Sequence, residues 1–561
     1  MPEDILASNP IAFPRLEAYD LAILKPLSDI LTFSDGEVIF HAGDADLDLF
    51  VVETGGIKIL NPSDENRHIV THGPGQFAGD IDLLTHRPVI VTGVADGQTQ
   101  LLRIKTSRLH EILSKVPNLA EKLLIAIQER RRLLVATGVV GLKIVGPGNC
   151  RDTMLIREFL FKNFVPFTWY DSLSNQGQKL LNGWSSPKEL PVIECSTGQL
   201  LMNPGLRELA QSIGVWRHCP AEKTDLAIVG AGPAGMTAAV YAASEGLSTV
   251  VLDSLGPGGQ AAGSSKIENF IGFPSGLSGT ELATRSVLQM LKFGAKMAAP
   301  VSVLRIEPAA TPDDFHALHL DCGNILLART VLIAAGVHWR KLEAPGVKRF
   351  ESAGIYYACT SVEAILHDKQ DVAVVGAGNS AGQAAMFLAE CCHERTVHLL
   401  VRKELGSSMS EYLIGRIKAA RNIVLHEGVE IAAVQGKQQL ESVTLRVFDP
   451  LLNNTEKQIE ASCETIPLSA VFVFIGADPG CSWLPETLAR DSLGYIMTGI
   501  DALQSGRWPL KDREPCPLET TIPRILAAGD IRAGSTKRVG FAVGDGSLAV
   551  TCVHKLVAIR S

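Results

Sequence analysis

The fold is decided by the stretch Asp225-Leu-Ala-Ile-Val-Gly-Ala-Gly-Pro-Ala-Gly-Met-Thr-Ala-Ala-Val-Tyr-Ala-Ala-Ser-Glu-Gly-Leu-Ser-Thr-Val-Val-Leu-Asp253. It predicts a buried strand, a glycine turn, a helix and a second strand. The turn carries G-x-G-x-x-G, in which the glycines permit a tight turn, close approach of a pyrophosphate and close helix packing. The helix N-terminus offers free N–H groups to phosphates, and a carboxylate at the second strand's end accepts a ribose hydroxyl. The predicted dinucleotide-contacting residues are Gly230, Gly232, Pro233, Ala234 and Asp253.

The same unit recurs in Asp371-Val-Ala-Val-Val-Gly-Ala-Gly-Asn-Ser-Ala-Gly382, with Ala381 at the third glycine position. Its second strand, residues 396–401, is followed by Arg402 and Lys403 instead of an acid. Cations attract a 2′-phosphate, which an acid would repel. The first turn therefore suits a dinucleotide with free ribose hydroxyls, and the second suits NADPH better than NADH. Together they indicate a flavoprotein supplied by a nicotinamide nucleotide. The predicted residues of the second site are Gly376, Gly378, Asn379, Ser380, Arg402 and Lys403.

The composition is that of a globular enzyme. The 561 residues leave room for about three or four domains. The net charge of −8 gives no reason to expect nucleic acid as a partner. No apolar run reaches the length of a membrane span, and Met1–Pro10 lacks a signal-peptide pattern, so we expect a cytoplasmic protein without a membrane partner. Eleven cysteines without any C-x-x-C indicate reduced thiols, and we expect no metal site.

Residues 1–137 predict a β-roll followed by helices. Apolar strands alternate with Gly, Asp and Pro turns over residues 30–104, and helical patterns follow at 107–113 and 119–134. The basic run Glu129-Arg-Arg-Arg132 is expected to end the last helix and to complement its dipole.

This order of elements resembles a cyclic-nucleotide-binding domain. Residues 77–91 are similar to that family's phosphate-binding cassette, with Asp80 at the position of the glutamate that binds the ribose hydroxyl. Val89 stands where the family's arginine holds the cyclic phosphate. Without that arginine the phosphate loses its charge-assisted partner, although Arg87 could substitute. Binding of a cyclic nucleotide is therefore doubtful, and packing or dimerisation is the other use of such a domain.

Residues 138–218 resemble a shortened glutaredoxin or thioredoxin fold. Strands are predicted at 141–145, 166–170 and 190–195, and a helix at 153–163. Cys150 stands where that family has the first cysteine of C-x-x-C, Thr153 replaces the resolving cysteine, and Pro191 stands at the family's cis-proline. A thiol at a helix start can exchange with disulfides alone. Both a monothiol role for Cys150 and a redox-inactive adaptor domain remain open.

Residues 222–561 resemble a flavoprotein of the thioredoxin reductase type. The resemblance rests on residues 258–260 (G-G-Q), 267–274 (I-E-N-F-I-G-F-P), 331–336, 526–530 and 538–546. It implies two Rossmann-like three-layer ββα bodies: an FAD domain at 222–338 and 471–561, and an inserted NAD(P) domain at 339–470. It also implies a homodimer. The FAD-contacting residues that it implies are Gly259, Gln260, Asn269, Ala335, Gly336, Gly529, Asp530, Arg538 and Val539, the last at a family glutamine.

The chain departs from that family at the redox centre. In Tyr357-Ala-Cys-Thr-Ser-Val362, Ala358 and Ser361 occupy the two cysteine positions of the family's C-A-T-C. A dithiol relay needs an attacking and a resolving thiol. Cys359 lies between the two positions and is either a lone redox thiol or a buried small residue. The family's phosphate-binding motif is also incomplete, because Ser407 replaces its last arginine.

The leading hypothesis is an α/β FAD-dependent NAD(P)H oxidoreductase without its own dithiol. Hydride would pass from NADPH to FAD and then to an external acceptor: a partner protein, a quinone-like or other small molecule, or dioxygen. One alternative is a flavin oxidase or dehydrogenase that acts on a small metabolite. The other is a redox or nucleotide sensor without turnover.

Overall fold

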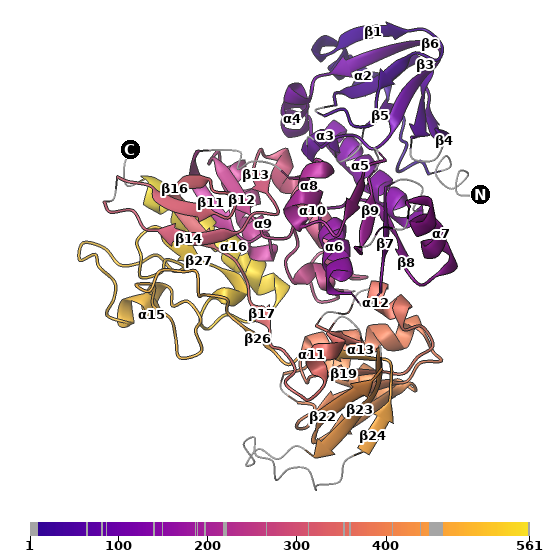
Figure 1. Ribbon diagram of the computed structural model, residues 1–561. Helices are drawn as coiled ribbons and strands as arrows, with labels where there is room; N and C mark the ends of the chain where they lie inside the picture. Colours follow the sequence, from indigo (N-terminus) through magenta and orange to yellow (C-terminus); the bar gives the residue numbers. More distant parts are fainter. Residues whose placement is uncertain are drawn as a thin grey trace.

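The computed structural model describes residues 9–558, apart from positions 46, 63–65, 80, 81, 86, 138–140, 149, 186, 188, 196, 197, 217–221, 265, 312, 352, 353, 358, 360, 407, 438 and 448–463. Figure 1 shows four bodies of α/β or β structure. A β-roll lies at one end, two nucleotide-binding bodies form two further lobes, and a small unit (residues 141–216) lies between them. Of the helices formed by the described residues, none combines the length and the apolar character needed to cross a bilayer.

The β-roll is antiparallel, in the order β1-β6-β3-β4, with β2 paired to β6 and β5 to β3. The strands and helices predicted for this region are confirmed. Its elements are α2 (Ala18–Leu24), η1 (Lys25–Leu27), β1 (Asp29–Phe33), β2 (Val38–Phe40), β3 (Leu49–Asn61), β4 (Arg67–His72), β5 (Phe77–Ala78), α3 (Asp82–Thr85), β6 (Thr92–Ile104), α4 (Thr106–Lys115) and α5 (Pro117–Thr137).

The basic run at residues 129–132 does not end a helix, because α5 continues to Thr137. Arg130 is buried, and its guanidinium lies over the rings of Phe77 (4.2 Å) and Phe13 (5.1 Å). Its Nε donates to the carbonyl of Ala12 at 2.7 Å and its Nη1 to that of Gly79 at 2.6 Å. The expected role in complementing the helix dipole was therefore wrong. This arginine fixes α5 to the N-terminal segment and to the cassette.

The small unit has a four-stranded mixed sheet in the order β10-β9-β7-β8. Cys150 directly precedes α6, and the Leu190–Pro191 bond is cis. The predicted strands and helix are confirmed within a few residues. The elements are β7 (Leu142–Gly146), α6 (Arg151–Lys162), β8 (Phe167–Asp171), α7 (Asn175–Gly183), β9 (Val192–Glu194), β10 (Leu200–Met202) and α8 (Leu206–Ser212).

The first nucleotide-binding body holds the stretch that decides the fold. Its sheet has the order β13-β12-β11-β16-β15-β14, with β27 paired to β16. The elements are β11 (Lys223–Val229), α9 (Pro233–Ser244), β12 (Thr249–Leu252), η2 (Ala261–Gly263), α10 (Gly279–Lys292), β13 (Lys296–Ala298), β14 (Val303–Glu307), β15 (His316–Leu320), β16 (Ile325–Ile333), α15 (Gly499–Gln504), β27 (Ile525–Ala527), η4 (Gly529–Ile531) and α16 (Val539–Ala558).

The central strand β11 is buried on both faces. Leu226 and Ile228 pack into the cluster formed with α9, α10 and α16. Ala227 and Val229 pack into the cluster on the opposite face. Successive side chains of a strand point to opposite faces, so an uninterrupted apolar run suits a parallel strand covered on both sides. This is why residues 225–229 read as a buried strand.

The second nucleotide-binding body repeats this plan in three layers. Its parallel sheet, β18-β25-β19-β20-β21, has helices on one face and the antiparallel sheet β22-β23-β24 on the other. The elements are α11 (Val347–Phe350), β18 (Ile355–Tyr356), α12 (Ser361–Leu366), β19 (Val372–Val375), α13 (Asn379–Cys391), β20 (Val397–Val401), α14 (Glu411–Ala419), β21 (Ile423–Glu427), β22 (Val429–Gly436), β23 (Leu440–Val447), β24 (Glu464–Pro467) and β25 (Ala470–Val473).

Two short strands connect the nucleotide-binding bodies. β17 (His338–Trp339) pairs antiparallel with β26 (Ala477–Asp478) where the chain enters and leaves the second body. The predicted boundary at 470/471 falls inside β25, which pairs with β18 and β19. The second body therefore extends beyond that boundary. The boundary at 338/339 falls inside β17.

The buried Asn163 joins three bodies. Its carbonyl oxygen accepts a hydrogen bond from Nη1 of Arg87 in the β-roll. Its Nδ2 donates to the carbonyls of Phe159 and Leu255, each at 2.8 Å, and Leu255 belongs to the first nucleotide-binding body. The two nucleotide-binding bodies are linked by Arg416 and Glu268, whose Nη1 and Oε2 atoms are 2.8 Å apart. The small unit is thus fixed against its neighbours by specific bonds.

We expect Ile228→Ala to lower the free energy of unfolding of the first nucleotide-binding body by about 2–5 kcal/mol, because it opens a cavity in a fully buried strand. Ile500→Ala removes the same atoms from a side chain that is 61% exposed, and should change it by less than about 0.5 kcal/mol. Urea unfolding followed by circular dichroism measures both. Equal effects of the two substitutions would contradict the buried position of β11.

Candidate functional site

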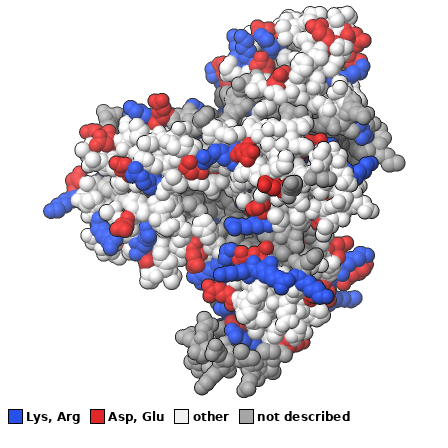
Figure 2. Space-filling model, in the orientation of Figure 1, with Lys and Arg blue, Asp and Glu red and all other residues white. Residues whose placement is uncertain are grey.

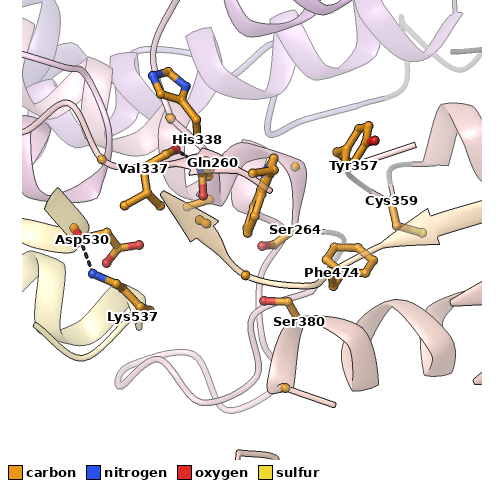
Figure 3. Close-up of a pocket in the computed structure, with 18 of the residues that line it drawn as sticks. Gln260, Ser264, Val337, His338, Tyr357, Cys359, Ser380, Phe474, Asp530 and Lys537 are labelled. Atoms are coloured by element: carbon orange, nitrogen blue, oxygen red, sulfur yellow. Dashed lines mark hydrogen bonds between the residues drawn. The ribbon is translucent and has the colours of Figure 1, made fainter. Parts of the chain in front are cut away.

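One cavity of about 2450 Å³ receives both glycine turns. It is lined by residues of the two nucleotide-binding bodies and of α6 in the small unit. Figure 3 shows Asp530 and Lys537 on one side of it and Cys359, Tyr357 and Phe474 on the other. The two predicted dinucleotide sites therefore open into the same space.

The first turn is built from backbone packed too closely for side chains. At Gly230, with φ of +108°, a Cβ would lie 2.3 Å from the carbonyl oxygen of Ala334. At Gly235 a Cβ would lie 1.9 Å from the carbonyl oxygen of Gly230. Gly232 differs, because a Cβ there would have no protein atom nearer than 3.9 Å. This glycine therefore leaves space on the cavity side, directly at the N-terminus of α9.

That space fits a dinucleotide pyrophosphate. Gly232 is the N-cap residue of α9 and supplies no side-chain cap, so the first N–H groups of the helix are left for a ligand. The carboxylate of Asp253 braces the same turn, because its Oδ2 accepts from the N–H of Ala231 at 2.8 Å and its Oδ1 from those of Leu255 and Gly256. Each carboxylate oxygen has two lone pairs, so Oδ2 can still accept a ribose hydroxyl.

The second turn has the same construction. Gly378 is the N-cap of α13 without a side-chain cap, and a Cβ there would meet its nearest atom at 3.9 Å. Oδ1 of Asn379 accepts from the N–H of Ser410 at 2.7 Å, which fixes the loop beside the turn. Both Arg402 and Lys403 line the cavity and are exposed. However, Nε of Arg402 lies 3.2 Å from Oε2 of Glu430, so this cation is shared with a protein carboxylate.

The structure brings nearly all predicted cofactor residues together. Asn269 is the exception: it is exposed and does not line the cavity, and the neighbouring Ile271 is 91% exposed. Ser407 lies outside the described residues. The predicted residues that line the cavity are Gly230, Gly232, Pro233, Ala234, Asp253, Gly259, Gln260, Ala335, Gly336, Gly376, Gly378, Asn379, Ser380, Arg402, Lys403, Gly529, Asp530, Arg538 and Val539.

Sequence reasoning missed a cation beside Asp530 at the cavity. Lys537 donates through Nζ to the carbonyl of Asp530 and lies 4.1 Å from the ring centre of Tyr495. Burial raises the pKa of the Asp530 carboxyl above its usual value, and the ammonium of Lys537 partly offsets this. Burial likewise lowers the pKa of Lys537. In the sequence, the sign of this cation is the position of Lys537 one residue before the predicted Arg538.

The cysteine candidates differ in their surroundings. Cys359 lines the cavity but is only 4% exposed, and burial, together with the negative charge of Glu363, raises the pKa of its thiol well above the usual value. Its backbone pairs with Ser264 next to η2. Cys150 is half-buried and does not line the cavity. Ala358, at one of the two redox positions, lies outside the described residues, and the side chain of Ser361 is not described.

In the cassette of the β-roll, neither position 89 nor the expected substitute Arg87 offers a phosphate ligand. Val89 is buried, with its backbone paired to Gly43 and Asp44. Arg87, the expected substitute, is also buried and donates to Asn163 of the small unit. Asp80 lies outside the described residues. Among the described residues, no group of three or more His, Cys, Asp or Glu side chains is arranged to hold a metal ion.

Two Rossmann-like bodies that open into one cavity define a class, the flavin- and nicotinamide-nucleotide-dependent oxidoreductases. The family model described as pyridine nucleotide-disulphide oxidoreductase matches residues 224–546. The chain belongs to this family and is an FAD-dependent oxidoreductase. A second model, described as cyclic nucleotide-binding domain, matches residues 30–116. The resemblances stated for the β-roll and for residues 222–561 are thus confirmed.

Individual relatives agree with the family match, because they are oxidoreductases by name. Thioredoxin reductase of Mycoplasma pneumoniae is 28% identical over 334 residues, which are 59% of this chain and 95% of that enzyme. NADH dehydrogenase of Bacillus subtilis is 28% identical over 354 residues, which are 63% of this chain and 62% of that enzyme. The crystal structure of T. acidophilum thioredoxin reductase superimposes with a TM-score of 0.52 at 25% identity, covering 61% of this chain and all of that chain.

Alanine substitutions at Gly232 and Gly378 should each weaken the binding of one of the two nucleotides. Because a Cβ at either position meets no protein atom nearer than 3.9 Å, Gly232→Ala and Gly378→Ala should leave the fold intact. A methyl group at the pyrophosphate should weaken FAD binding by about tenfold or more in Gly232→Ala. Gly378→Ala should instead raise the NAD(P)H concentration for half-maximal flavin reduction. Flavin absorbance measures FAD binding, and anaerobic titration measures the NAD(P)H concentration for half-maximal reduction. Gly415→Ala on α14 is the control. Full FAD affinity in Gly232→Ala would refute the assignment of the first turn.

Cys359→Ser should retain flavin reduction and acceptor turnover within about twofold between pH 6 and pH 8. The raised pKa keeps the thiol protonated in this range, and a protonated thiol is a poor nucleophile. Stopped-flow absorbance under anaerobic conditions, followed by addition of a naphthoquinone, gives both rates. A loss of turnover of more than about tenfold, with flavin reduction unchanged, would show that Cys359 relays electrons.

Proposed function

We propose that the enzyme passes hydride from NADPH to FAD and from FAD to an acceptor that is not part of the chain. The observation that carries this proposal is the opening of both glycine turns into one cavity. FAD supplies the hydride-accepting flavin ring when bound. The protein's residues hold the two nucleotides, orient them and exclude water.

The first turn is assigned to FAD and the second to NADPH. The FAD residues are those of the first turn together with Asp253, Gly259, Gln260, Ala335, Gly336, Gly529, Asp530, Arg538 and Val539, all of which line the cavity, whereas the exposed Asn269 is not assigned to FAD. Gly376, Gly378, Asn379 and Ser380 cradle the NADPH pyrophosphate. Arg402 and Lys403 attract the 2′-phosphate of NADPH. Glu430 shares Arg402, so Lys403 carries most of the preference over NADH.

The acceptor is external because the chain contains no C-x-x-C pair. The burial of Cys359 supports this, because it raises the pKa of the thiol and a protonated thiol is a poor nucleophile. Cys150 has no partner thiol at position 153 and does not reach the cavity lining.

The remaining parts support the oxidoreductase. We assign residues 1–137 to the cyclic-nucleotide-binding-like domain and 138–218 to a thioredoxin-like domain without redox activity. The FAD domain comprises 222–338 and 474–561 and the NADP domain 339–473, because β25 belongs to the sheet of the latter. The loss of the cassette arginine at Val89 argues against a cyclic nucleotide ligand. We place the enzyme in the cytoplasm as a homodimer, without nucleic acid or membrane partners.

Anaerobic titration of the yellow protein with NADPH and with NADH tests the proposal. NADPH should bleach the flavin absorbance stoichiometrically, and NADH should require a concentration about three times higher or more. Lys403→Gln should raise the half-saturating NADPH concentration about fivefold and leave that of NADH unchanged. Lys418→Gln, an exposed lysine of α14 outside the cavity, is the charge-matched control.

If neither nucleotide bleaches the flavin, the proposal fails. Bleaching by a small metabolite without NADPH would then identify an oxidase or dehydrogenase. Tight binding of both nucleotides without reduction would identify a sensor.

A further inference from the structure

The small unit contributes a buried cation to the cavity. Arg157 on α6 is 7% exposed and lines the cavity, although it lies outside the family match that begins at residue 224. Figure 1 shows α6 lying between α10 of the first nucleotide-binding body and α12 of the second. Met154, one turn earlier on the same helix, packs into the hydrophobic cluster that contains Tyr356 and Cys359. Arg157 thus faces the space where the family match and the small unit meet.

The guanidinium of Arg157 is poorly satisfied by the protein. It lies 4.3 Å from the ring centre of Trp169, which supports its charge but accepts no hydrogen bond. Its Nη1 donates to Sδ of Met154 at 3.6 Å, and a thioether is a weak acceptor. Its Nε is buried and has no hydrogen-bond partner among the residues that the structure describes. A buried charge normally requires a paired, hydrogen-bonded counterion.

Among the described residues, the carboxylate of Glu363 is a counter-charge for Arg157. Burial lowers the pKa of the Arg157 guanidinium, whereas the negative charge of Glu363 acts in the opposite direction. Glu363 acts on Arg157 through its charge and not through a hydrogen bond. Arginine stays protonated in proteins, so the role of a hydrogen-bonded counterion is left to a ligand. An oxyanion suits it, because carboxylate, sulfonate and phosphate oxygens accept two parallel bonds from a guanidinium.

The two nucleotides do not account for this cation. Their pyrophosphates are assigned to the turns at Gly232 and Gly378, which belong to the family match. The Mycoplasma pneumoniae thioredoxin reductase is matched over 95% of its length by 334 residues of this chain, so such an enzyme has no room for a counterpart of the whole N-terminal region. The remaining ligand of the cavity is the electron acceptor.

We propose that Arg157 binds an oxyanion on a small electron acceptor and so selects anionic acceptors. This proposal rests on the proposed function. The acceptor would place its oxyanion against α6 and its reducible part towards the flavin side of the same cavity. For a quinone, the hydride delivered by NADPH and one proton from solvent give the hydroquinone, and NADP⁺ leaves, so two electrons and two protons are accounted for.

Turnover of a paired set of quinones tests this specificity. The probes are a naphthoquinone and the same ring bearing one sulfonate. Arg157→Met should lower kcat/KM for the sulfonated quinone by about tenfold or more and leave the neutral quinone within about twofold. Arg157→Lys, which keeps the charge but loses the planar fork, should give an intermediate loss. Arg151→Met removes an exposed arginine of the same helix that also lines the cavity, and serves as the matched control.

Salt separates a buried site from surface attraction. In the unaltered enzyme the preference for the sulfonated quinone should survive 0.5 M NaCl if Arg157 carries it, because buried pairs are screened little. Loss of the preference in salt, or an equal effect of Arg157→Met and Arg151→Met, would overturn the proposal. So would a tenfold change in FAD affinity or in half-saturating NADPH in Arg157→Met, which would assign the cation to a nucleotide.

Binding without turnover keeps the two proposals apart. Naphthalenesulfonate, a fluorescent probe that accepts no hydride, should bind the oxidised holoenzyme about tenfold more weakly after Arg157→Met. If NADPH does not reduce the flavin but this difference is found, the proposed function fails and the oxyanion site stands. If the flavin is reduced but the probe binds both proteins equally, the oxyanion site fails alone.

Discussion

The structure depends on the close approach of backbone segments at the end of β11. The first glycine turn, the turn at 258–260 and the segment after β16 meet with no space for side chains between them: a Cβ at Gly259 would lie 2.9 Å from Cα of Gly232, and one at Gly230 would lie 2.3 Å from the carbonyl of Ala334. Strands β11 and β16 are parallel, so both end at the same edge of the sheet. In such sheets the ligand binds beyond that edge. The position of the cavity therefore follows from strand direction, and the glycines keep it open.

The N-terminal region is part of the site's architecture. The β-roll reaches the small unit through Arg87, and the small unit reaches the first nucleotide-binding body through Nδ2 of Asn163. Helix α6 then forms one wall of the cavity. Figure 2 shows Lys and Arg lying beside Asp and Glu where the lower lobe meets the rest of the molecule, so this face presents mixed charge. The proposed selection of an anionic acceptor thus depends on Arg157, a buried cation whose interactions salt screens little.

Local chemistry made much of this predictable. Glycine spacing, apolar runs and helix starts gave both nucleotide turns, the small unit and the roll, because each signal lies within one supersecondary unit. The predictions that failed concern residues whose contacts are distant in the sequence. Arg130 reads as a basic helix end, but its acceptors lie at residues 12 and 79. Asn269 belongs to the motif at residues 267–274, yet it is exposed. The neighbouring Glu268 accepts a hydrogen bond from Arg416 of the second nucleotide-binding body. The 470/471 boundary fell inside β25 because motifs do not report strand pairing.

Family membership says less about the electron acceptor than about the two nucleotides. The family match begins at residue 224 and ends at 546, whereas the wall that contains Arg157 comes from α6. Among the described cysteines of the match, the one that lines the cavity, Cys359, is desolvated and is subject to the negative charge of Glu363, so its thiolate is disfavoured twice. The residues assigned to the two nucleotides lie within the family match, whereas the proposed acceptor site lies between that match and α6. Identity of 28% to a thioredoxin reductase therefore constrains the nucleotides far more than the electron acceptor. The acceptor's charge should be set by the part of the chain that lies before residue 224.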